Sequence, residues 1–364
     1  MRIAHIDTGK DLRGGQGQLL TLARELRERD YDQVIVCSRG SELERRACAE
    51  GFQTLGLRFK GPASLRALLR LRSLVRRQHI CVLHAHDGRG QTLAWLSSCG
   101  LRVCRVASRR VAFLPRGRFI HRLKYAHTCH GVIAVSAYVR NLLVESGIPA
   151  SQVAVIPDGI DFPEKLPDLC EKAQLRRKWQ LDREDFVVGH AGAFAPEKGQ
   201  AVAIEAVYML GLPHLRLLLA GEGPTRKRLE ENYLLKGAAG SVRFLGYLED
   251  HSAFMDALDL FLMPSSSEGL GSAVLMAMSH GVPVIATRVG GLPEIVEEGV
   301  DGWLVNASSP RALAEALRAA ESNRIRLKHM GERARSKARQ FTGAIMAERT
   351  VELYTELVER FGLR

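Results

Sequence analysis

The chain has 364 residues, of which 46% are apolar and 25% are charged. This is enough for two globular domains that each bury a core of their own. No apolar run approaches the roughly 18 residues that a membrane-spanning helix needs, and the first residues resemble a strand rather than a secretion signal. The seven cysteines include no C-x-x-C pair, which argues against a zinc site and favours a reduced, cytoplasmic setting.

The charge is distributed unevenly along the chain. Residues 1–150 hold 26 Lys and Arg against 11 Asp and Glu, a balance of +15, whereas the remaining residues carry −3. A basic N-terminal half predicts an anionic partner, which could be a nucleic acid, an acidic substrate or an anionic membrane. Aromatic residues make up only 6% of the chain and no nucleic-acid-binding motif occurs, so nucleic acid is the least favoured of the three.

The N-terminal half alternates short apolar runs with helical patterns. We expect strands at residues 2–6, 34–37, 53–57, 80–84, 103–107, 131–135 and 153–156. The first strand is followed by a glycine-rich loop that contains Gly14 and Gly15, and then by a helix. Such a loop lets a phosphate or a sugar approach the backbone, although many doubly wound domains need it only for tight packing.

Residues 62–78 predict a helix that carries both leucines and arginines. Leu65, Leu68, Leu69, Leu71 and Val75 can share one apolar face, with five arginines interspersed. One interpretation is a domain helix with a solvated basic face. The other is a basic amphipathic helix that touches a membrane surface.

Polar residues follow two of the expected strands of this half. His84 and His86 lie at the end of the strand 80–84, where ligands of open α/β sheets collect. We expect His84 and His86 to point to opposite sides, and therefore expect no metal site and a buried structural role for one of the two. Arg109 and Arg110 follow the strand 103–107, and the segment 102–124 is rich in basic residues.

The C-terminal half repeats the alternation of strand and helix. We expect strands at residues 186–190, 215–220, 242–245, 258–263, 282–286 and 302–305. Helices are expected at 137–146 and 169–179, and a last one at 341–361. Alternating strands and helices in two halves predict an α/β protein with two doubly wound domains and parallel sheets.

One stretch, residues 264–281, combines a strand end, a glycine-rich turn and a helix start. Its sequence is PSSSEGLGSAVLMAMSHG. The free amide groups and the dipole of such a helix start favour an anion. Glu268 precedes the turn, where a carboxylate either accepts hydrogen bonds from sugar hydroxyls or only caps the helix.

Several separated motifs resemble those of one family, in the family's order. They are P-D-G-I-D at 157–161, P-E-K-G at 196–199, G-E-G-P at 221–224, the stretch just described, and G-G-L-P-E at 290–294. Together they resemble the retaining GT-B glycosyltransferases of family four, also called glycosyl transferases group 1. The resemblance implies two Rossmann-like domains facing a central cleft. Residues 1–162 would form the acceptor side together with a crossing helix at 341–364, and residues 163–340 would bind the donor.

The resemblance also assigns site residues. It implies catalytic roles for Lys198, Glu268, His86 and Arg110. Residues implied to bind the donor, a nucleotide-diphosphate sugar of UDP type, are Gly14, Gly15, Lys198, Gly246, Tyr247, Glu268, Gly269, Leu270, Gly271, Ser272 and Met276. Neither a metal nor a cofactor is expected, because no acidic pair with metal-binding spacing stands out.

Three positions depart from the family's pattern. Relatives have an arginine where this chain has Ala193, and an acidic residue that meets the ribose where it has Met276. Relatives often place a histidine where Arg109 and Arg110 follow their strand. Met276 is either an apolar core residue or a sign of weaker nucleotide binding. The alternative to an enzyme is therefore a non-catalytic relative that binds a sugar or a nucleotide.

The basic half and the resemblance together suggest an acceptor. We expect a lipid-linked or lipopolysaccharide-like glycan of the cell envelope, reached by peripheral docking on an anionic membrane surface at the inner face of the plasma membrane. Nucleic acid is not expected as a partner, and the sequence leaves the sugar, the linkage and the oligomeric state open.

Overall fold

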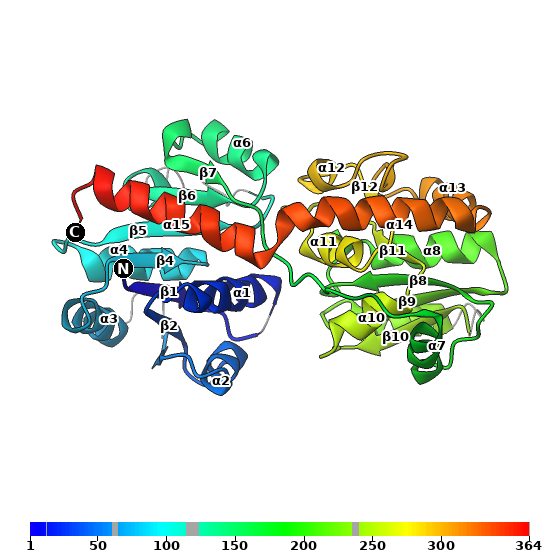
Figure 1. Ribbon diagram of the computed structural model, residues 1–364, viewed down its shortest axis with the longest axis horizontal. Coiled ribbons are helices and arrows are strands. Elements are labelled where there is room, and N and C mark those ends of the chain that lie inside the picture. The colour runs from blue at the N-terminus through cyan, green and yellow to red at the C-terminus, as the bar shows by residue number, and fades with distance from the viewer. Residues whose placement is uncertain (12, 60–64, 114–123, 235–239, 364) are drawn as a thin grey trace. The chain divides into compact units, whose positions relative to one another are not determined.

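The computed structural model describes residues 1–11, 13–59, 65–113, 124–234 and 240–363. The chain forms two compact units, one made of Met1–Gly159 with Gly343–Arg364 and the other of Ile160–Thr342. We call them unit 1 and unit 2 (Figure 1). No helix in the described ranges combines the length and the apolar character needed to cross a bilayer.

Unit 1 contains a parallel sheet of seven strands in the order β3-β2-β1-β4-β5-β6-β7. The strands are β1 (Ile3–Asp7), β2 (Gln33–Ser38), β3 (Thr54–Leu57), β4 (Val82–Ala85), β5 (Cys104–Arg109), β6 (Gly131–Ala134) and β7 (Val153–Val155). Its helices are α1 (Gly14–Glu28), α2 (Glu42–Ala49), α3 (Leu65–Arg77), α4 (Gly88–Ser98), α6 (Ala137–Glu145) and α15 (Gly343–Arg360).

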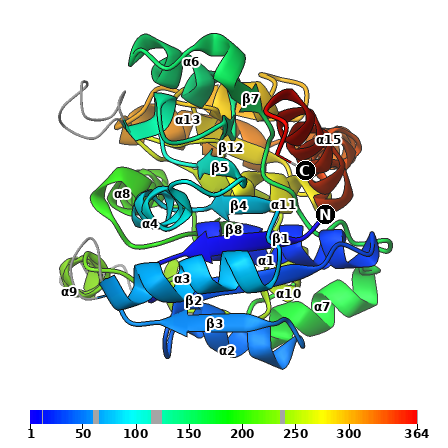
Figure 2. The same ribbon diagram turned by 90° about the vertical axis from the view of Figure 1, so that its left-hand side faces the viewer.

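The sheet of unit 1 is covered on both faces, because alternate strand residues point to opposite sides. Ile3 of β1 packs with residues of α1 and α15, whereas its neighbour Ala4 packs with residues of α3 and α4. Figure 2 shows α3 and α15 on opposite sides of this sheet. Helix α15, from the end of the chain, therefore completes the core of the unit that the chain forms first.

Unit 2 contains a parallel sheet of six strands in the order β10-β9-β8-β11-β12-β13. The strands are β8 (Phe186–Ala191), β9 (Leu215–Ala220), β10 (Val242–Gly246), β11 (Leu260–Met263), β12 (Val284–Thr287) and β13 (Gly302–Val305). Its helices are α7 (Leu169–Lys178), α8 (Gln200–Leu210), α9 (Arg226–Leu234), α10 (His251–Ala257), α11 (Ser272–Ser279), α12 (Leu292–Ile295), α13 (Pro310–Glu321) and α14 (Arg324–Ala338). Its central strands are buried apolar runs, as expected for a sheet covered on both faces.

Each sheet has one point where the order of the strands reverses. In unit 1 the chain builds outward from β1 to β3 and then returns to place β4 on the other side of β1. In unit 2 the same reversal occurs between β8 and β11. Open α/β sheets bind ligands beyond the carboxyl ends of the strands at such a reversal. The loops after β1, β4, β8 and β11 are therefore the first places to look for a site.

The expected strands are all present, with ends that differ by up to two residues. The expected apolar face of the helix at 62–78 is wrong in part. Helix α3 buries Ala67, Leu71 and Val75, but Leu65 and Leu69 are 68% and 58% exposed. Residues 62–64 of that helix and residues 114–123 of the basic segment 102–124 lie outside the described residues.

Candidate functional site

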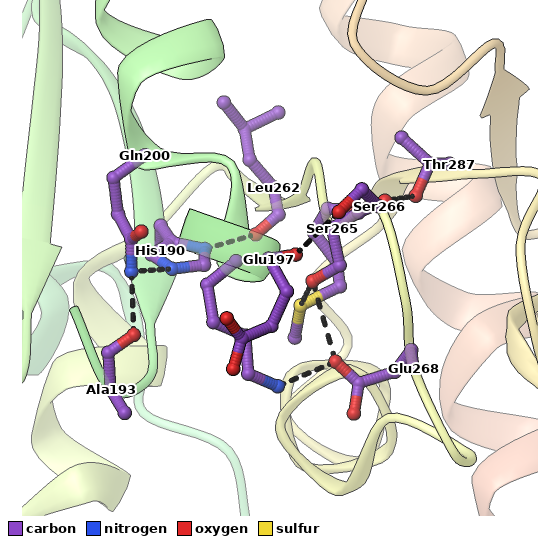
Figure 3. A network of polar contacts seen from close by, with 11 residues as sticks. His190, Ala193, Glu197, Gln200, Leu262, Ser265, Ser266, Glu268 and Thr287 are labelled. Carbon is purple, nitrogen blue, oxygen red and sulfur yellow. Dashed lines mark hydrogen bonds and ion pairs between the residues drawn. The ribbon is translucent and has the colours of Figure 1, made fainter. Parts of the chain in front are cut away.

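In unit 2 an ion pair joins the two loops at the reversal point. Lys198 lies in the loop after β8, and its Nζ donates to Glu268 Oε2, in the loop after β11, over 2.6 Å. The side chains are 23% and 14% exposed, so the pair is largely but not fully withdrawn from water. Ser265 Oγ donates to the same carboxylate oxygen over 3.3 Å (Figure 3). The two residues that the sequence singled out most strongly are thus brought together.

Backbone contacts hold these two loops in register. The amide of Ser266 donates to the carbonyl of Glu197 over 2.8 Å. Gly199 has φ +71° and lies so close to the carbonyl of Pro264 that a Cβ there would be 2.0 Å from its oxygen. Gly290, with φ +58°, approaches the carbonyl of Glu268 in the same way. Only glycine suits these two positions, so the backbone around Lys198 and Glu268 is fixed before any ligand binds.

Buried polar side chains form hydrogen bonds at the start of the loop that contains Lys198. His190 of β8 contacts the carbonyl of Leu262 through Nδ1 (3.0 Å) and Gln200 Nε2 through Nε2 (3.2 Å). Gln200 Nε2 also donates to the carbonyl of Ala193 over 2.9 Å (Figure 3). Since the amide nitrogen of Gln200 can only donate, His190 accepts at Nε2 and donates at Nδ1. Burial lowers the pKa of His190 to about 4, which keeps it neutral.

Helix α11 begins at this site without a side-chain cap. Its N-cap is Gly271, in a left-handed conformation with φ +103°. The interpretation of Glu268 as a helix cap is therefore wrong, because this carboxylate contacts Lys198 and Ser265 instead. The first amide groups of the helix have no partner within it and are available to an anion. Ser272 and Met276 are half-buried, so Met276 does not belong to the buried core.

The other expected donor residues lie on neighbouring loops or in unit 1. Gly246 ends β10, and the Tyr247 side chain beside it is 48% exposed. Leu270 is buried, which makes it a packing residue of the turn that also contains Gly269. In unit 1, Gly14 and Gly15 open helix α1. A Cβ on Gly15 would meet nothing within 4 Å, so packing among the described residues does not require glycine there.

In unit 1 three buried imidazoles gather at the reversal point. The rings of His84 and His86 have centroids 4.1 Å apart, and His5 Nδ1 lies 3.1 Å from His86 Nε2. The expectation that His84 and His86 point to opposite sides, with only one in the core, is wrong. Residues two apart along a strand lie on the same face, and His86, one residue past the end of β4 at Ala85, stays on the side of His84.

The hydrogen bonds around His86 run in one direction. Arg110 can only donate, so its Nη1, at 3.2 Å, makes Nδ1 of His86 an acceptor. His86 therefore donates through Nε2 to His5, and His5 donates to Gln33 Oε1 over 3.1 Å. Gln33 Nε2 donates to the carbonyls of Ala23 and Tyr31, which fixes its orientation. We call this series the histidine relay: Arg110, His86, His5 and Gln33.

Burial keeps the three histidines uncharged, and their ring nitrogens are already taken up by other partners. Desolvation lowers the pKa of His5 to about 4, and it lowers those of His84 and His86 well below their usual value. The ring nitrogens of His84 contact Tyr354 (2.6 Å) and Ser108 (2.8 Å). The three histidines are the one group with metal-binding spacing among the residues the structure describes. Each nitrogen already has a partner, so the donor set fits a hydrogen-bond network better than a metal.

Arg110 links this network to the end of another strand. Its Nε donates to Asp158 Oδ1 over 2.8 Å, and the two side chains are 13% and 10% exposed. The sequence predicts Arg110 and His86 as site residues but not Asp158, His5, Gln33 or Ser265. Asp158 and Ser265 lie inside the recognised motifs and could have been singled out. His5 and Gln33 lie within ordinary strands and carry no signal of their own.

Two family models match the chain, one for each unit. The model for glycosyltransferase family 4 matches residues 12–163, and the model for glycosyl transferases group 1 matches residues 171–337. Together they cover most of the chain, which belongs to the family-four, group 1 glycosyltransferases. The chain is 33% identical over 231 residues to D-inositol 3-phosphate glycosyltransferase of Corynebacterium urealyticum, and that region is 59% of this chain and 54% of the relative.

A second relative and a solved structure give the same picture. The lipopolysaccharide core biosynthesis glycosyltransferase LpsE of Rhizobium meliloti is 35% identical over 159 residues, or 43% of this chain and 46% of the relative. The chain thus spans about half the length of these two relatives. The crystal structure of Anabaena Alr3699/HepE with UDP has a TM-score of 0.88 and 21% identity, covering 98% of this chain and all of that one. The fold is GT-B.

Proposed function

We propose that the protein transfers a sugar from a nucleotide-diphosphate sugar to an acceptor, with retention of configuration and without a metal ion. Unit 2 binds the donor and unit 1 the acceptor. UDP is the expected nucleotide, in line with the UDP bound in the HepE crystal structure. The observation that carries the proposal is the Lys198–Glu268 pair between glycine-shaped loops at the reversal point of unit 2.

In this proposal Lys198 and Glu268 move apart when the donor binds, and each then contacts a different part of the donor. Lys198 and the first amides of α11 bind the diphosphate, because both offer positive charge to phosphate oxygens. Glu268, released from Lys198, accepts hydrogen bonds from hydroxyls of the sugar. The backbone at Gly246 and Tyr247 contacts the base. Gly14 and Gly15 contact the donor at the start of α1, where a Cβ on Gly15 would meet nothing within 4 Å.

The chemistry then rests on positioning and on the leaving group. The departing diphosphate gains negative charge as the sugar leaves, and preorganised cations and amides stabilise that charge in the transition state. Arg110 is the polar group of unit 1 that meets the reacting sugar or its acceptor, and His86, whose two ring nitrogens both have partners, supports it. No protein nucleophile is required, and the burial of His84 and His5 fits a supporting role for these two.

The acceptor is a lipid-linked or lipopolysaccharide-like glycan, and unit 1 docks on an anionic membrane. The exposed leucines 65 and 69 alternate on α3 with the exposed Arg66 and Arg70, a pattern that suits an interfacial helix. The similarity to LpsE, a lipopolysaccharide core biosynthesis glycosyltransferase, supports the same class of acceptor. Basic residues near such a surface contribute about 1 kcal/mol each, screened by salt.

Co-sedimentation with vesicles tests the membrane part. We expect binding to anionic vesicles at low salt that declines at high salt, and weaker binding by Leu69→Ser and Arg70→Ser. Arg311→Ser in unit 2 is the matched exposed control. Equal binding to neutral vesicles, or none at low salt, contradicts the docking proposal.

Melting and transfer assays test the enzymatic part. UDP at 100 times its dissociation constant should add about 2.7 kcal/mol to the free energy of unfolding. Candidate UDP sugars should be hydrolysed or transferred, and a chelator should leave the rate unchanged. Loss of activity on chelation contradicts metal independence, and the absence of any effect of UDP contradicts the choice of donor.

Two substitutions favour a second candidate, a protein that binds a nucleotide sugar without turnover. Ala193 offers no cation beside Lys198, and the half-buried Met276 offers no carboxylate to a ribose. A thioether is only a weak acceptor. Binding of UDP sugars without hydrolysis or transfer to any glycan acceptor would support this candidate over the enzyme.

A further inference from the structure

Arg110 has hydrogen-bonding capacity that unit 1 does not use. A guanidinium carries five N–H donors, and the described residues take up one at Nε, through Asp158, and one at Nη1, through His86. Nη2 makes no hydrogen bond with the described residues and is not among their buried unpaired atoms. The side chain is 13% exposed, so it is not fully enclosed.

The surroundings hold this guanidinium in one orientation. Asp158 fixes it from the end of β7, and the neutral His86 fixes it from the end of β4. His86 is itself held by His5, and His5 by Gln33. An ion pair with a purely structural role would need only Asp158 as the partner of Arg110. The neutral ring of His86 fixes the orientation of the guanidinium without cancelling its positive charge. His86, His5 and Gln33 therefore position the Arg110 cation at the reversal point of the sheet, where ligands bind.

The nearby carboxylates are occupied elsewhere. Asp87 accepts from the amide of Thr8 (3.1 Å) and from that of Gly90 (2.6 Å). Asp7 accepts from the amide of Gly9 (2.8 Å) and from Gln16 (2.9 Å). These bonds shape the loops after β1 and β4. Apart from Asp158, then, no carboxylate of the described residues pairs with Arg110.

Because a fixed planar fork matches the two oxygens of an oxyanion, we propose that Arg110 binds a carboxylate or phosphate group on the acceptor. The inference deepens the proposed function, on which it rests: it makes the acceptor an anionic glycan. Arg110 is the binding group, and His86, His5 and Gln33 are positioning residues.

Titration calorimetry of the full chain with three probes at low salt tests this site. The probes are glucuronate, glucose 6-phosphate and glucose, which share a ring and differ in charge. We expect at least one charged probe to bind and glucose not to bind. Arg110→Gln should weaken that binding by about 10- to 100-fold, the usual effect of losing a charge-assisted hydrogen bond. Preference between the two charged probes identifies carboxylate or phosphate.

The neighbouring Arg109 provides the matched control. Its guanidinium lies over the ring of Phe113 and donates to the carbonyl of that residue, so Arg109→Gln removes the same charge without touching the relay. Affinity should be unchanged in this variant. Equal losses in both variants would indicate diffuse attraction and overturn the proposal, as would equal binding of glucose or binding of no charged probe.

A spectroscopic readout covers the positioning role. The ¹⁵N signal of Arg110 Nε, assigned by its absence in Arg110→Lys, should shift on titration with the bound probe. In His5→Phe the Asp158 contact remains, but the shift and the affinity should both decrease. An unchanged response in His5→Phe overturns the role of the relay. UDP-induced stabilisation of the same samples tests the donor site separately, so failure of the proposed function and failure of this site give different results.

Discussion

Replacing Lys198 by alanine tests the candidate site most directly. In the free protein its ammonium lies 2.6 Å from Glu268, and only Ser265, at 3.3 Å, remains as a described partner of that carboxylate after the change. Losing one preorganised donor to a developing anion costs about 10²- to 10³-fold in rate. Losing a hydrogen bond between charged groups costs about 1.5–3 kcal/mol of stability at most, and the partial exposure of both side chains reduces that figure.

Two further variants separate the rate from the stability. Lys198→Ala combined with Glu268→Gln removes the unpaired charge, so stability should return while the rate stays low. Lys172→Ala is the matched control, because Lys172 pairs with Asp259 at the opposite, amino end of β11 with similar exposure. It should lower stability and leave the rate unchanged.

Turnover of a UDP sugar at saturating concentration and urea unfolding are measured on all of these proteins. A wild-type rate in Lys198→Ala would refute the assignment. Recovery of activity in the double variant would show that the lysine serves only to neutralise Glu268. A rate loss in Lys172→Ala as large as that in Lys198→Ala would mean that the assay reports stability.

Two other predictions concern the nucleotide and pH. Met276→Glu should leave the fold intact and tighten UDP binding by about 10- to 100-fold through a charge-assisted hydrogen bond; weaker binding, or unfolding, would show that the ribose is held elsewhere. His5 and His190 have pKa values of about 4 in the folded chain and about 6.5 when unfolded. Between these values the unfolded chain binds more protons. The free energy of unfolding should therefore fall as pH drops from about 6.5 towards 4, by up to about 1.4 kcal/mol per pH unit for each histidine. Urea unfolding measured across this pH range tests the prediction, and a flat profile would contradict it. His190→Gln should reduce the slope of the free energy of unfolding against pH.

The sequence predicted the parts of the site that depend on local order along the chain. Lys198 and Glu268 each follow a buried strand within a few residues, and parallel strands β8 and β11 place their carboxyl ends side by side. Glycines at 199 and 290 mark the turns that bring the loops together. These short-range signals identify the two residues, whereas their contact also requires that β8 and β11 be neighbours in the sheet.

The network of unit 1 could not be anticipated in the same way. His84 and His86 lie on one side because they are two residues apart, but His5 joins them only through the pairing of β1 with β4. The contact between Arg110 and Asp158 joins the ends of β5 and β7, which are separated in the sheet by β6. Their proximity follows from strand order, and from a side chain long enough to span it, rather than from any spacing in the sequence.

Both units place a cation and a carboxylate together where a ligand is expected, and the pairing has a physical reason. An unpaired cation in a partly buried site is costly, so Lys198 and Arg110 each need a partner while the site is empty. A ligand anion must then compete with that partner. Lys198 contacts Glu268 through a flexible stem and can move from the carboxylate to a phosphate. Arg110 keeps Asp158 and His86 and still has an unused edge. Under the proposed function, exchange suits the donor, because its diphosphate must be released after each turnover. The oxyanion of an acceptor only has to be held in place. It can bind the unused edge of Arg110 without displacing Asp158.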